Sequence, residues 1–261
     1  MNIKLFIVAS LLFIFVGQEA YSQYGVSNEL GVFVGPVLFR SDYGQRKDSE
    51  TNMKNSGFAF GVAHYLNFAY QAPSFFNEHF KIKTELDYIT ASFEHYGEWV
   101  ADDKQSIGAD QLRAMSGSTT VIEIGSMLEY YPLSIIDFEY QNYKLAPYIG
   151  LGAHWVNFSP KAETSYGTKD IRDPNNYPDK YRNAFQTESG STWALVGSLG
   201  VRYKLTKTSD LVLDSRWSMY ASDYVDGLNP SLKNNGSTPV HENKANDWVW
   251  WLNFGYVFYL D

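Results

Sequence analysis

Histidine, serine and carboxylate side chains are the groups in this chain whose spacing could support catalysis or metal binding. The 261 residues include five histidines and no cysteine, which excludes thiol catalysis and cysteine-based zinc sites. His79, His95 and His241 fall in or beside expected loops and lack the spacing of a metal triad. We therefore predict no catalytic group, no metal centre and no cofactor for this chain.

A larger set of ionisable side chains occupies the polar face of several alternating segments. The set is Lys81, Lys83, Glu85, Asp87, Glu123, Glu129, Arg202, Lys204, Asp214 and Arg216. Its signs are close to balanced, and unpaired charges in a confined interior would be costly, so we predict a network of crossed ion pairs. Such a network is either a polar plug, the interpretation we favour, or part of a gated ion or proton path. His154 faces the same way and is expected to join the plug.

His64 stands apart because its parity places it on the opposite, apolar face. Ionisable groups at membrane depth are costly and often functional. Thr84 and Pro36 on the neighbouring segments share that face, so the three residues are a candidate contact for a protein partner. A local shift in register or a position near the membrane surface would also explain His64. Catalysis is disfavoured because the outward Ser126 and Ser215 lie on other segments without an outward acid.

Acidic clusters occur at Asp102-Asp103 and at residues 170–173. They could hold a calcium ion or bridge lipopolysaccharide, but they lack the ligand spacing of a dedicated calcium loop. Solvated loop charge is the interpretation we favour.

Hydrophobicity alternates with period two along the segments that carry these side chains, which is typical of strands with two different faces. About eight such segments can be recognised. They cover residues 28–40, 58–70, 80–93, 122–130, 145–155, 193–204, 211–219 and 248–260. In each segment one face is apolar and the other is small or charged.

The two faces indicate where the strands lie. The chain is 17% aromatic but has a mean hydropathy of only −0.31, and its large aromatics gather near the ends of the apolar faces. This pattern suits two interfacial girdles around a narrow interior. Strands of about 12 to 14 residues also exceed the ~9–11 residues needed to cross a bilayer. We predict an all-β fold, an eight-stranded antiparallel up-and-down transmembrane β-barrel. A soluble lipocalin-like barrel or sandwich is the alternative.

The links between segments alternate in length. Residues 41–56, 97–118, 159–191 and 222–246 form long polar links, whereas 71–79, 132–143 and 206–209 form short ones. Short periplasmic turns and long extracellular loops are typical of outer-membrane barrels. With an even number of strands, both termini are then expected in the periplasm.

The N-terminal segment has the features of an export signal. Lys4 precedes an apolar run from Leu5 to Val16, and small residues occur at Ala20 and Ser22. We predict a signal peptide over residues 1–22 and a single barrel domain over residues 23–261. An N-terminal membrane anchor is the weaker alternative because the apolar run is short for a bilayer.

The charge balance limits the partners. The chain has 21 Lys and Arg against 29 Asp and Glu, a net charge of −8, and no basic tract, which argues against a nucleic-acid partner. An outer-membrane location makes lipid and lipopolysaccharide the expected surroundings.

Five stretches, residues 34–44, 64–70, 112–115, 128–134 and 146–154, resemble a family of small outer-membrane barrels from Bacteroidota, especially flavobacteria. The similarity spans most of the mature chain. Those barrels are in turn similar, at the level of the fold, to the small barrel that accompanies the periplasmic ring of the type IX secretion and gliding machinery. The family supplies no catalytic motif to transfer to these residues.

The resemblance implies a non-enzymatic scaffold or accessory subunit of an envelope complex, with type IX secretion as the favoured complex. Envelope protein subunits would then be its partners. Two alternatives stay open: a surface-binding or adhesion barrel that acts through its extracellular loops, and, less favoured, an outer-membrane lipid-modifying enzyme.

Overall fold

The structure, a computed structural model, describes residues 25–45, 48–182, 184–229 and 246–260. The predicted signal peptide over residues 1–22 lies outside the described residues. Within the described ranges, no helix combines the length and the apolar character needed to cross a membrane.

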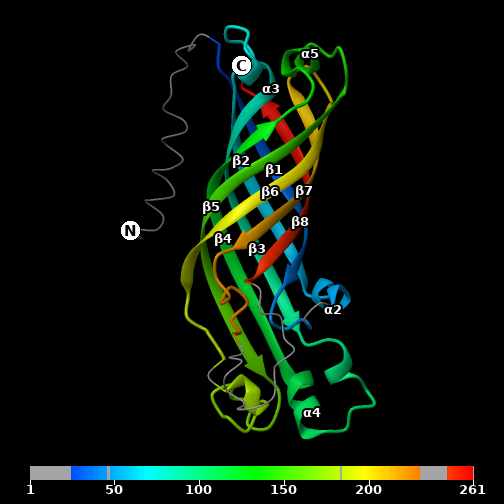
Figure 1. Cartoon of the computed structure of the whole chain (residues 1–261), viewed down its shortest axis with the longest axis vertical. Coiled ribbons are helices and arrows are strands. Elements are labelled where there is room, and N and C mark those ends of the chain that lie inside the picture. Colours follow the sequence, from blue (N-terminus) through cyan, green and yellow to red (C-terminus); the bar gives the residue numbers. More distant parts are fainter. Residues whose placement is uncertain (1–24, 46–47, 183, 230–245, 261) are drawn as a thin grey trace.

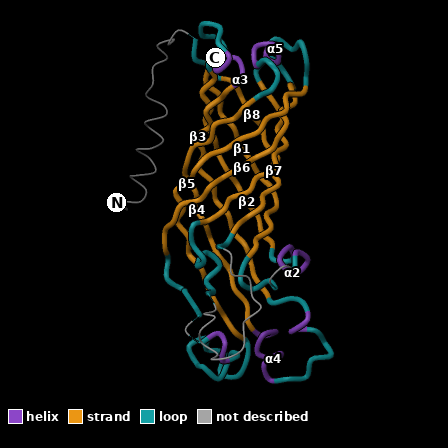
Figure 2. The backbone as a smooth tube through the Cα atoms, viewed as in Figure 1, coloured by secondary structure: helices purple, strands orange, loops and turns teal. Residues whose placement is uncertain are grey.

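Eight antiparallel strands form a closed barrel in sequence order, and β8 pairs back onto β1 (Figures 1 and 2). The strands are β1 (Ser27–Arg40), β2 (Ser56–Asn67), β3 (Phe80–Glu94), β4 (Met115–Tyr130), β5 (Leu145–Thr164), β6 (Gly190–Lys204), β7 (Ser209–Tyr220) and β8 (Trp248–Tyr259). The predicted number, order and direction of the strands are confirmed.

The period-two pattern sorts side chains to the two faces of the wall as predicted. Leu86 and Phe254 point outward and are 46% and 51% exposed, whereas Asp87 and Arg216 point inward and are 1% exposed. Exposed aliphatic and aromatic side chains occur on all eight strands, a far larger apolar surface than a soluble monomer carries. Only a hydrocarbon environment suits such a belt. The soluble barrel or sandwich, which would bury these side chains, is therefore rejected.

A charge placed in this belt should be strongly destabilising. Leu86 lies near the middle of β3, so Leu86→Arg should cost about 2–4 kcal/mol of unfolding free energy in lipid vesicles. The measurement is urea unfolding in vesicles. The control is Leu133→Arg, because Leu133 is equally exposed but lies in a turn beyond the wall. Equal losses for the two variants would contradict the membrane assignment of the belt.

The two ends of the barrel differ (Figure 1). The short-turn end carries α3 (Phe75–His79), α5 (Ile135–Glu139) and the turn at residues 205–208. The long-loop end carries α2 (Ser49–Met53), η1 (Glu98–Val100), α4 (Ile107–Ala114) and η2 (Asp179–Tyr181). Every α-helix begins after a side chain that accepts a hydrogen bond from its first turn, which fixes the start of these short helices. The capping residues are Asp48, Ser74, Ser106 and Ser134.

The second and third long loops are shorter than predicted. Residues 115–118 and 159–164 were expected in loops but extend β4 and β5, which pair from Met115 with Thr164 onward. The Ser and Thr residues there resemble loop composition, yet β-branched Thr is also a good strand former. The resulting ribbon projects beyond the end of β6 and supports the long loops.

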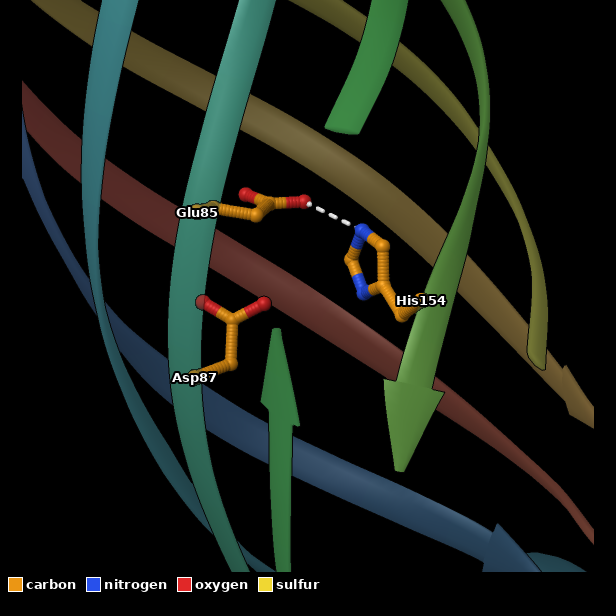
Figure 3. A group of neighbouring side chains, drawn as sticks. All are labelled: Glu85, Asp87 and His154. Carbon is orange, nitrogen blue, oxygen red and sulfur yellow. Dashed lines mark ion pairs between the residues drawn. The ribbon is translucent and has the colours of Figure 1, made fainter. Parts of the chain in front are cut away.

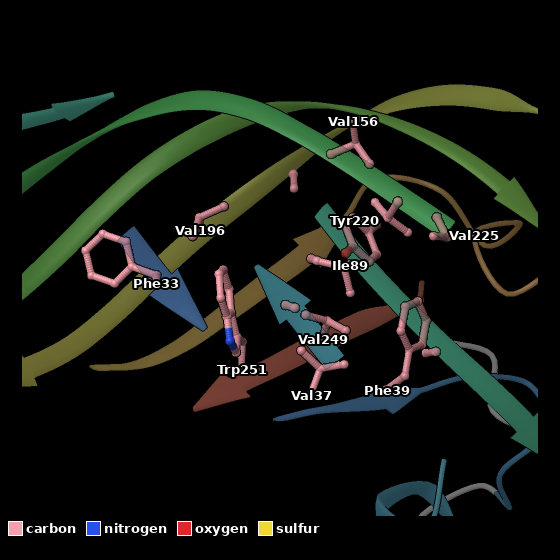
Figure 4. Close-up of a cluster of buried hydrophobic side chains, with 14 of the residues drawn as sticks. Phe33, Val37, Phe39, Ile89, Val156, Val196, Tyr220, Val225, Val249 and Trp251 are labelled. Carbon is pink, nitrogen blue, oxygen red and sulfur yellow. The ribbon is translucent and has the colours of Figure 1, made fainter. Parts of the chain in front are cut away.

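The interior has two layers. In the layer nearest the long loops the inward side chains are mainly apolar, and Val37, Ile89, Val156, Val196 and Val249 are all fully buried (Figure 4). Charged side chains fill the middle and the layer nearest the short turns. The predicted ion-pair network thus occupies only part of the lumen. Because an ion crossing the apolar layer would lose its water, the arrangement favours a plug over an ion path.

Candidate functional site

Glu29 on β1 is the centre of the charged cluster nearest the short turns. Its carboxylate pairs with both Lys81 on β3 and Arg202 on β6. Asp210 on β7 lies 3.5 Å from Arg202 and 3.1 Å from Lys204. All five side chains are at most 1% exposed, so the pairs are dry and cross between strands on different sides of the lumen. Burial of this kind is tolerated only because each charge has a partner.

Glu85 on β3 holds together the charged cluster at the middle of the barrel. One of its oxygens lies 2.6 Å from Lys83 Nζ and 2.8 Å from Arg216 Nη2. Arg216 also reaches Asp87, at 2.9 Å, and its guanidinium lies 4.9 Å from the centre of the Trp251 ring. Arg216 therefore neutralises two carboxylates at once and packs on the largest buried ring of the lumen.

His154 faces Glu85 and Asp87 from β5, and these three residues are the described group that most resembles a metal site (Figure 3). Their ligand atoms lie within 4.8 Å of one another. Both imidazole nitrogens, however, already face carboxylates, Glu85 at 3.2 Å and Glu123 at 2.9 Å. Lys83 and Arg216 occupy the remaining cation positions at Glu85. These cationic side chains are the counter-ions, and the geometry assigns no metal to the group.

Tyrosine hydroxyls complete the network. Tyr131 donates to Glu129 at 2.6 Å and Tyr148 donates to Asp214 at 2.9 Å. Arg202 lies 3.7 Å from Glu129, whereas among the described residues Asp214 has no ion pair. The ten charged residues predicted for the lumen are thus all inside it, nine of them in ion pairs and Asp214 held by a hydroxyl.

The structure adds Glu29, Asp210 and Glu139 to the network. Glu29 and Asp210 could have been found, because they share the inward parity of their strands. Glu139 comes from α5, which folds into the short-turn mouth and places the carboxylate 3.5 Å from Lys81. The period-two pattern of the strands could not predict Glu139, because this residue lies in a helix. The ten predicted residues are balanced, but with these additions the buried network has eight carboxyl groups and five Lys or Arg side chains.

Three of the outward candidates, His64, Thr84 and Ser126, lie in one row on β2, β3 and β4, whereas Pro36 and Ser215 lie elsewhere. His64 pairs in register with Thr84, and Thr84 pairs with Ser126. His64 Nε2 is 3.0 Å from Asn28 Oδ1, and the Thr84 and Ser126 hydroxyls are 3.0 Å apart. Each polar side chain in this lipid-facing row therefore has a hydrogen bond within the wall. Pro36 pairs with Phe58, six residues along β1 from the partner of His64, or roughly 20 Å away.

The long loops are folded into a cap over the barrel mouth. Tyr43 stacks on Phe93 at 5.5 Å between ring centres and contacts His95 at 4.8 Å, and His95 contacts Tyr181 at 5.5 Å. This column joins the first, second and third loops. A β-bridge from Phe185 to Leu228 joins the third loop to the fourth. We call the described residues 41–45, 48–55, 95–114, 165–182, 184–189, 221–229 and 246–247 the cap.

A polar pocket of about 460 Å³ lies between the end of β5 and the third loop of the cap. Its walls include Lys161, Glu163 and Arg172 together with Tyr177 and Phe185, whose rings pack edge to face at 4.8 Å. Charged groups beside aromatic faces are typical of a site that binds a polar ligand. The sequence did not reveal it, because β5 and the loop meet only in the fold.

The predicted acidic clusters lie in the cap, and the carboxylates of the second cluster accept hydrogen bonds from residues of their own turns. Asp173 accepts hydrogen bonds from Thr168 and Asn175, and Asp170 accepts one from the Arg172 N–H. Asp102 and Asp103 are in an exposed turn.

A different carboxyl pair is buried where the fourth loop meets the barrel. Asp226 accepts backbone N–H groups of Asp42 and Leu228, and Asp247 accepts those of Val225 and Asp226. Burial raises the pKa of Asp226 to about 7. Burial, with repulsion from Asp226, raises the pKa of Asp247 well above its usual range. The folded loop therefore holds protons that an unfolded carboxyl, with a pKa of about 3.9, releases.

The cap should consequently loosen as the pH rises. Stability from these carboxyls is fully present below about pH 4 and is lost as the pH rises through their folded pKa values. The pKa of the buried His95 is lowered to about 3, so His95 opposes this trend only below about pH 6.5. Between pH 6.5 and 8.5, amide exchange at Val225 and Asp226, corrected for intrinsic rates, should accelerate by roughly tenfold or more per pH unit.

Asp247→Asn provides the matched variant for that experiment. It keeps the acceptor for Val225 and Asp226 and places an amide on the oxygen that lacks a hydrogen bond among the described residues. The variant should lose most of the pH dependence while keeping its protection at pH 6.5. An unchanged pH profile would exclude this carboxyl as the cause.

No protein-family model matches the chain, and no curated protein matches it. Solved structures that resemble it include a major outer membrane protein of Thermus thermophilus, with 14% identity, a TM-score of 0.47 and coverage of 89% of this chain and 99% of that one. The Neisserial surface protein A, NspA, has 12% identity, a TM-score of 0.45 and coverage of 90% and 98%. OprG of Pseudomonas aeruginosa has 14% identity, a TM-score of 0.44 and coverage of 89% and 96%.

Proposed function

We propose that this chain is a non-enzymatic outer-membrane β-barrel that recognises a partner outside the cell through its cap. The observation that carries the proposal is the aromatic column from Tyr43 to Tyr181, which holds separate loops as one preorganised surface. Preorganisation lowers the entropic cost of binding. The lumen below is filled by ion pairs and valines, so the exposed cap is the part of the barrel that is free to act.

The proposed orientation places the cap outside the cell and the short-turn end in the periplasm. Long loops on the outer side and short turns on the inner side are usual for such barrels. Both ends of the described chain lie at the short-turn end, where the Leu260 N–H donates to the Asn28 carbonyl. Export would depend on the predicted signal peptide, and lipid and lipopolysaccharide would surround the wall.

The polar pocket suggests the chemistry of the ligand. Lys161 and Arg172 can form charge-assisted hydrogen bonds with acidic groups. Tyr177 and Phe185 offer ring surface, and Thr187 a hydroxyl, for an uncharged polar ligand. A polymer with both hydroxyl and acidic groups, which is the chemistry of an acidic polysaccharide, matches this lining.

Binding to immobilised polysaccharides tests the proposal. The barrel in nanodiscs is passed over neutral, carboxylated and sulfated polysaccharides, and we expect retention on the acidic ones. The double variant Lys161→Ala, Arg172→Ala should weaken binding roughly 100-fold or more, since hydrogen bonds to charged groups contribute about 1.5–3 kcal/mol each. Lys207→Ala at the short-turn end is the control. Equal binding by both variants, or none by the native barrel, would reject the proposal.

A second candidate is a scaffold subunit of an envelope complex, with type IX secretion as the complex that the sequence resemblance implies. An exposed aromatic cluster at the short-turn end favours it. Phe75 and Phe76 on α3 contact Phe80, His79 and Tyr130, and Phe75 is among the most exposed apolar side chains of the described chain. Aromatic anchors of this kind are enriched in protein interfaces. The His64 row is a further candidate contact for such a partner.

The scaffold candidate predicts stoichiometric partners. Affinity purification from native outer membranes, with quantitative mass spectrometry, should recover periplasmic or membrane subunits in constant ratio to the barrel. Phe75→Ser with Phe76→Ser should release them, whereas the cap variants should not. Recovery of the barrel alone from native membranes would leave surface recognition as the better account.

A further inference from the structure

A second pocket, of about 510 Å³, lies on the outside of the barrel beneath α2. We call it the wall pocket. Trp217 on β7 and Trp248 and Trp250 on β8 form its wall with Leu38 on β1. These residues are neighbours in register, Trp217 with Trp250 and Trp250 with Leu38. The opposite side of the pocket is α2, which contributes Ser49, Asn52 and Met53. The pocket is therefore a slot between a helix and the barrel rather than a depression in the barrel wall.

Two polar side chains in the floor of the slot are paired with each other. Trp250 Nε1 donates to Ser215 Oγ at 2.8 Å, which pairs the hydrogen-bonding groups of the two side chains with each other. The exposed surface there consists mainly of indole rings and aliphatic carbons. Such a floor offers water few hydrogen-bonding partners. Filling an apolar slot beside the hydrocarbon with water would therefore be unfavourable.

The place of the slot determines what can fill it. The strands that form it also carry the outward apolar belt, with Phe254 on β8 and Met219 on β7 among its exposed side chains. The slot therefore opens toward the membrane at the long-loop edge of the belt, where lipid is the abundant apolar molecule. We propose that the wall pocket binds one acyl chain of a lipid from the surrounding leaflet and holds it under α2.

The charged residues at the rim of the wall pocket determine which lipid head group is favoured. Arg40 lines the slot, with its guanidinium 5.9 Å from the centre of the Trp248 ring. The acidic group at the rim, Asp48, already accepts the N–H groups of Glu50 and Thr51 as the cap of α2. A basic group above an apolar slot suits a lipid with an acidic head group, such as a phosphate diester.

The chain provides an internal reference for an experiment. A shallower crevice of about 260 Å³ lies on the same wall between Phe60, Phe254 and Tyr256. It also opens to lipid, but it has neither a covering helix nor a cation among its lining residues. A generic layer of lipid would touch both sites, whereas a binding site would favour the wall pocket.

Photocrosslinking in vesicles compares the two sites directly. The probe is a phosphatidylglycerol with a diazirine on one acyl chain, in vesicles of phosphatidylglycerol and phosphatidylcholine. Mass spectrometry should find crosslinks at Trp217, Trp250 and Met53 enriched roughly fivefold over those at Phe60 and Phe254, which is what one extra aromatic contact supplies. Crosslinks spread according to exposure would overturn the proposal.

Two variants test the slot and its rim separately. Ser49→Trp fills the slot from α2 and should remove the enrichment, while Ser49→Ala should keep it. With a matched phosphatidylcholine probe the enrichment should be about fivefold lower in the native barrel, and Arg40→Gln should erase that difference. Lys54→Gln, on the same loop, is the control for charge. Enrichment that survives Ser49→Trp, or a head-group preference that survives Arg40→Gln, contradicts the corresponding part of the proposal.

Discussion

Arg216→Met should lower the free energy of unfolding by about 3–5 kcal/mol, because it leaves Glu85 and Asp87 buried without their shared cation. The measurement is urea unfolding in lipid vesicles, with intrinsic fluorescence and far-UV circular dichroism as probes. The loss should exceed that of any single exposed ion pair, such as Lys54 with Glu50, since exposed pairs contribute at most about 1 kcal/mol.

The matched control is Asp214→Asn, two residues away on the same face of β7. Asp214 is equally buried, but its described partner is the Tyr148 hydroxyl rather than a cation. Its replacement also removes one of the surplus carboxyl groups. We expect a change of less than about 1 kcal/mol, or a gain, because an amide oxygen can accept the same hydrogen bond. Equal destabilisation by the two variants would show that packing, and not charge pairing, holds this part of the lumen.

Trp251→Ala should be comparably destabilising, by about 3–5 kcal/mol, through a cavity at the junction of the charged and apolar layers. Trp251 is the largest fully buried side chain of the described chain. Its ring also approaches the positions that Cβ atoms would take at Gly35 and Gly61, so neighbouring side chains have little freedom to move in.

Trp193→Ala is the comparison for that variant. Trp193 is 57% exposed on the outer wall, where lipid replaces the lost ring. It forms an edge-to-face pair with Trp155, so its loss should cost only about 0.5–1.5 kcal/mol. The same unfolding measurement applies to both variants. A smaller loss for Trp251→Ala than for Trp193→Ala would reverse our assignment of inside and outside.

The fold was predictable because alternation is a local property. Leu86 beside Asp87, repeated over eight segments, is enough to assign two faces and to count the strands. The sequence predicts which residues face the lumen, because parity places Arg216 and Glu85 inside. It does not predict which of them pair, because the pairing depends on barrel tilt and register. Glu139 was missed because it enters from a helix in a turn, where period-two parity does not apply.

The cap and the wall pocket could not be predicted from the sequence for a related reason. Tyr43, His95 and Tyr181 come from three different loops, and no repeat in the chain marks them as neighbours. Trp217 and Trp248 belong to the alternating segments 211–219 and 248–260, yet the slot exists only because α2 folds back over them. Contacts between loops depend on how the wall positions their ends, which composition does not encode.

The pairing of β1 with β8 has a consequence for how this chain reaches its folded state. The Leu260 N–H and the Asn28 carbonyl, joined in the closed barrel, are separated by almost the whole described chain. Such a contact gives the topology a high contact order. The entropic cost of closing so long a loop must be overcome before β1 and β8 can pair. Until then the edges of β1 and β8 are exposed templates for pairing with other chains. Variants that weaken this seam, such as Gly35→Val, where a Cβ would meet the Leu252 carbonyl, should therefore slow assembly and increase aggregation.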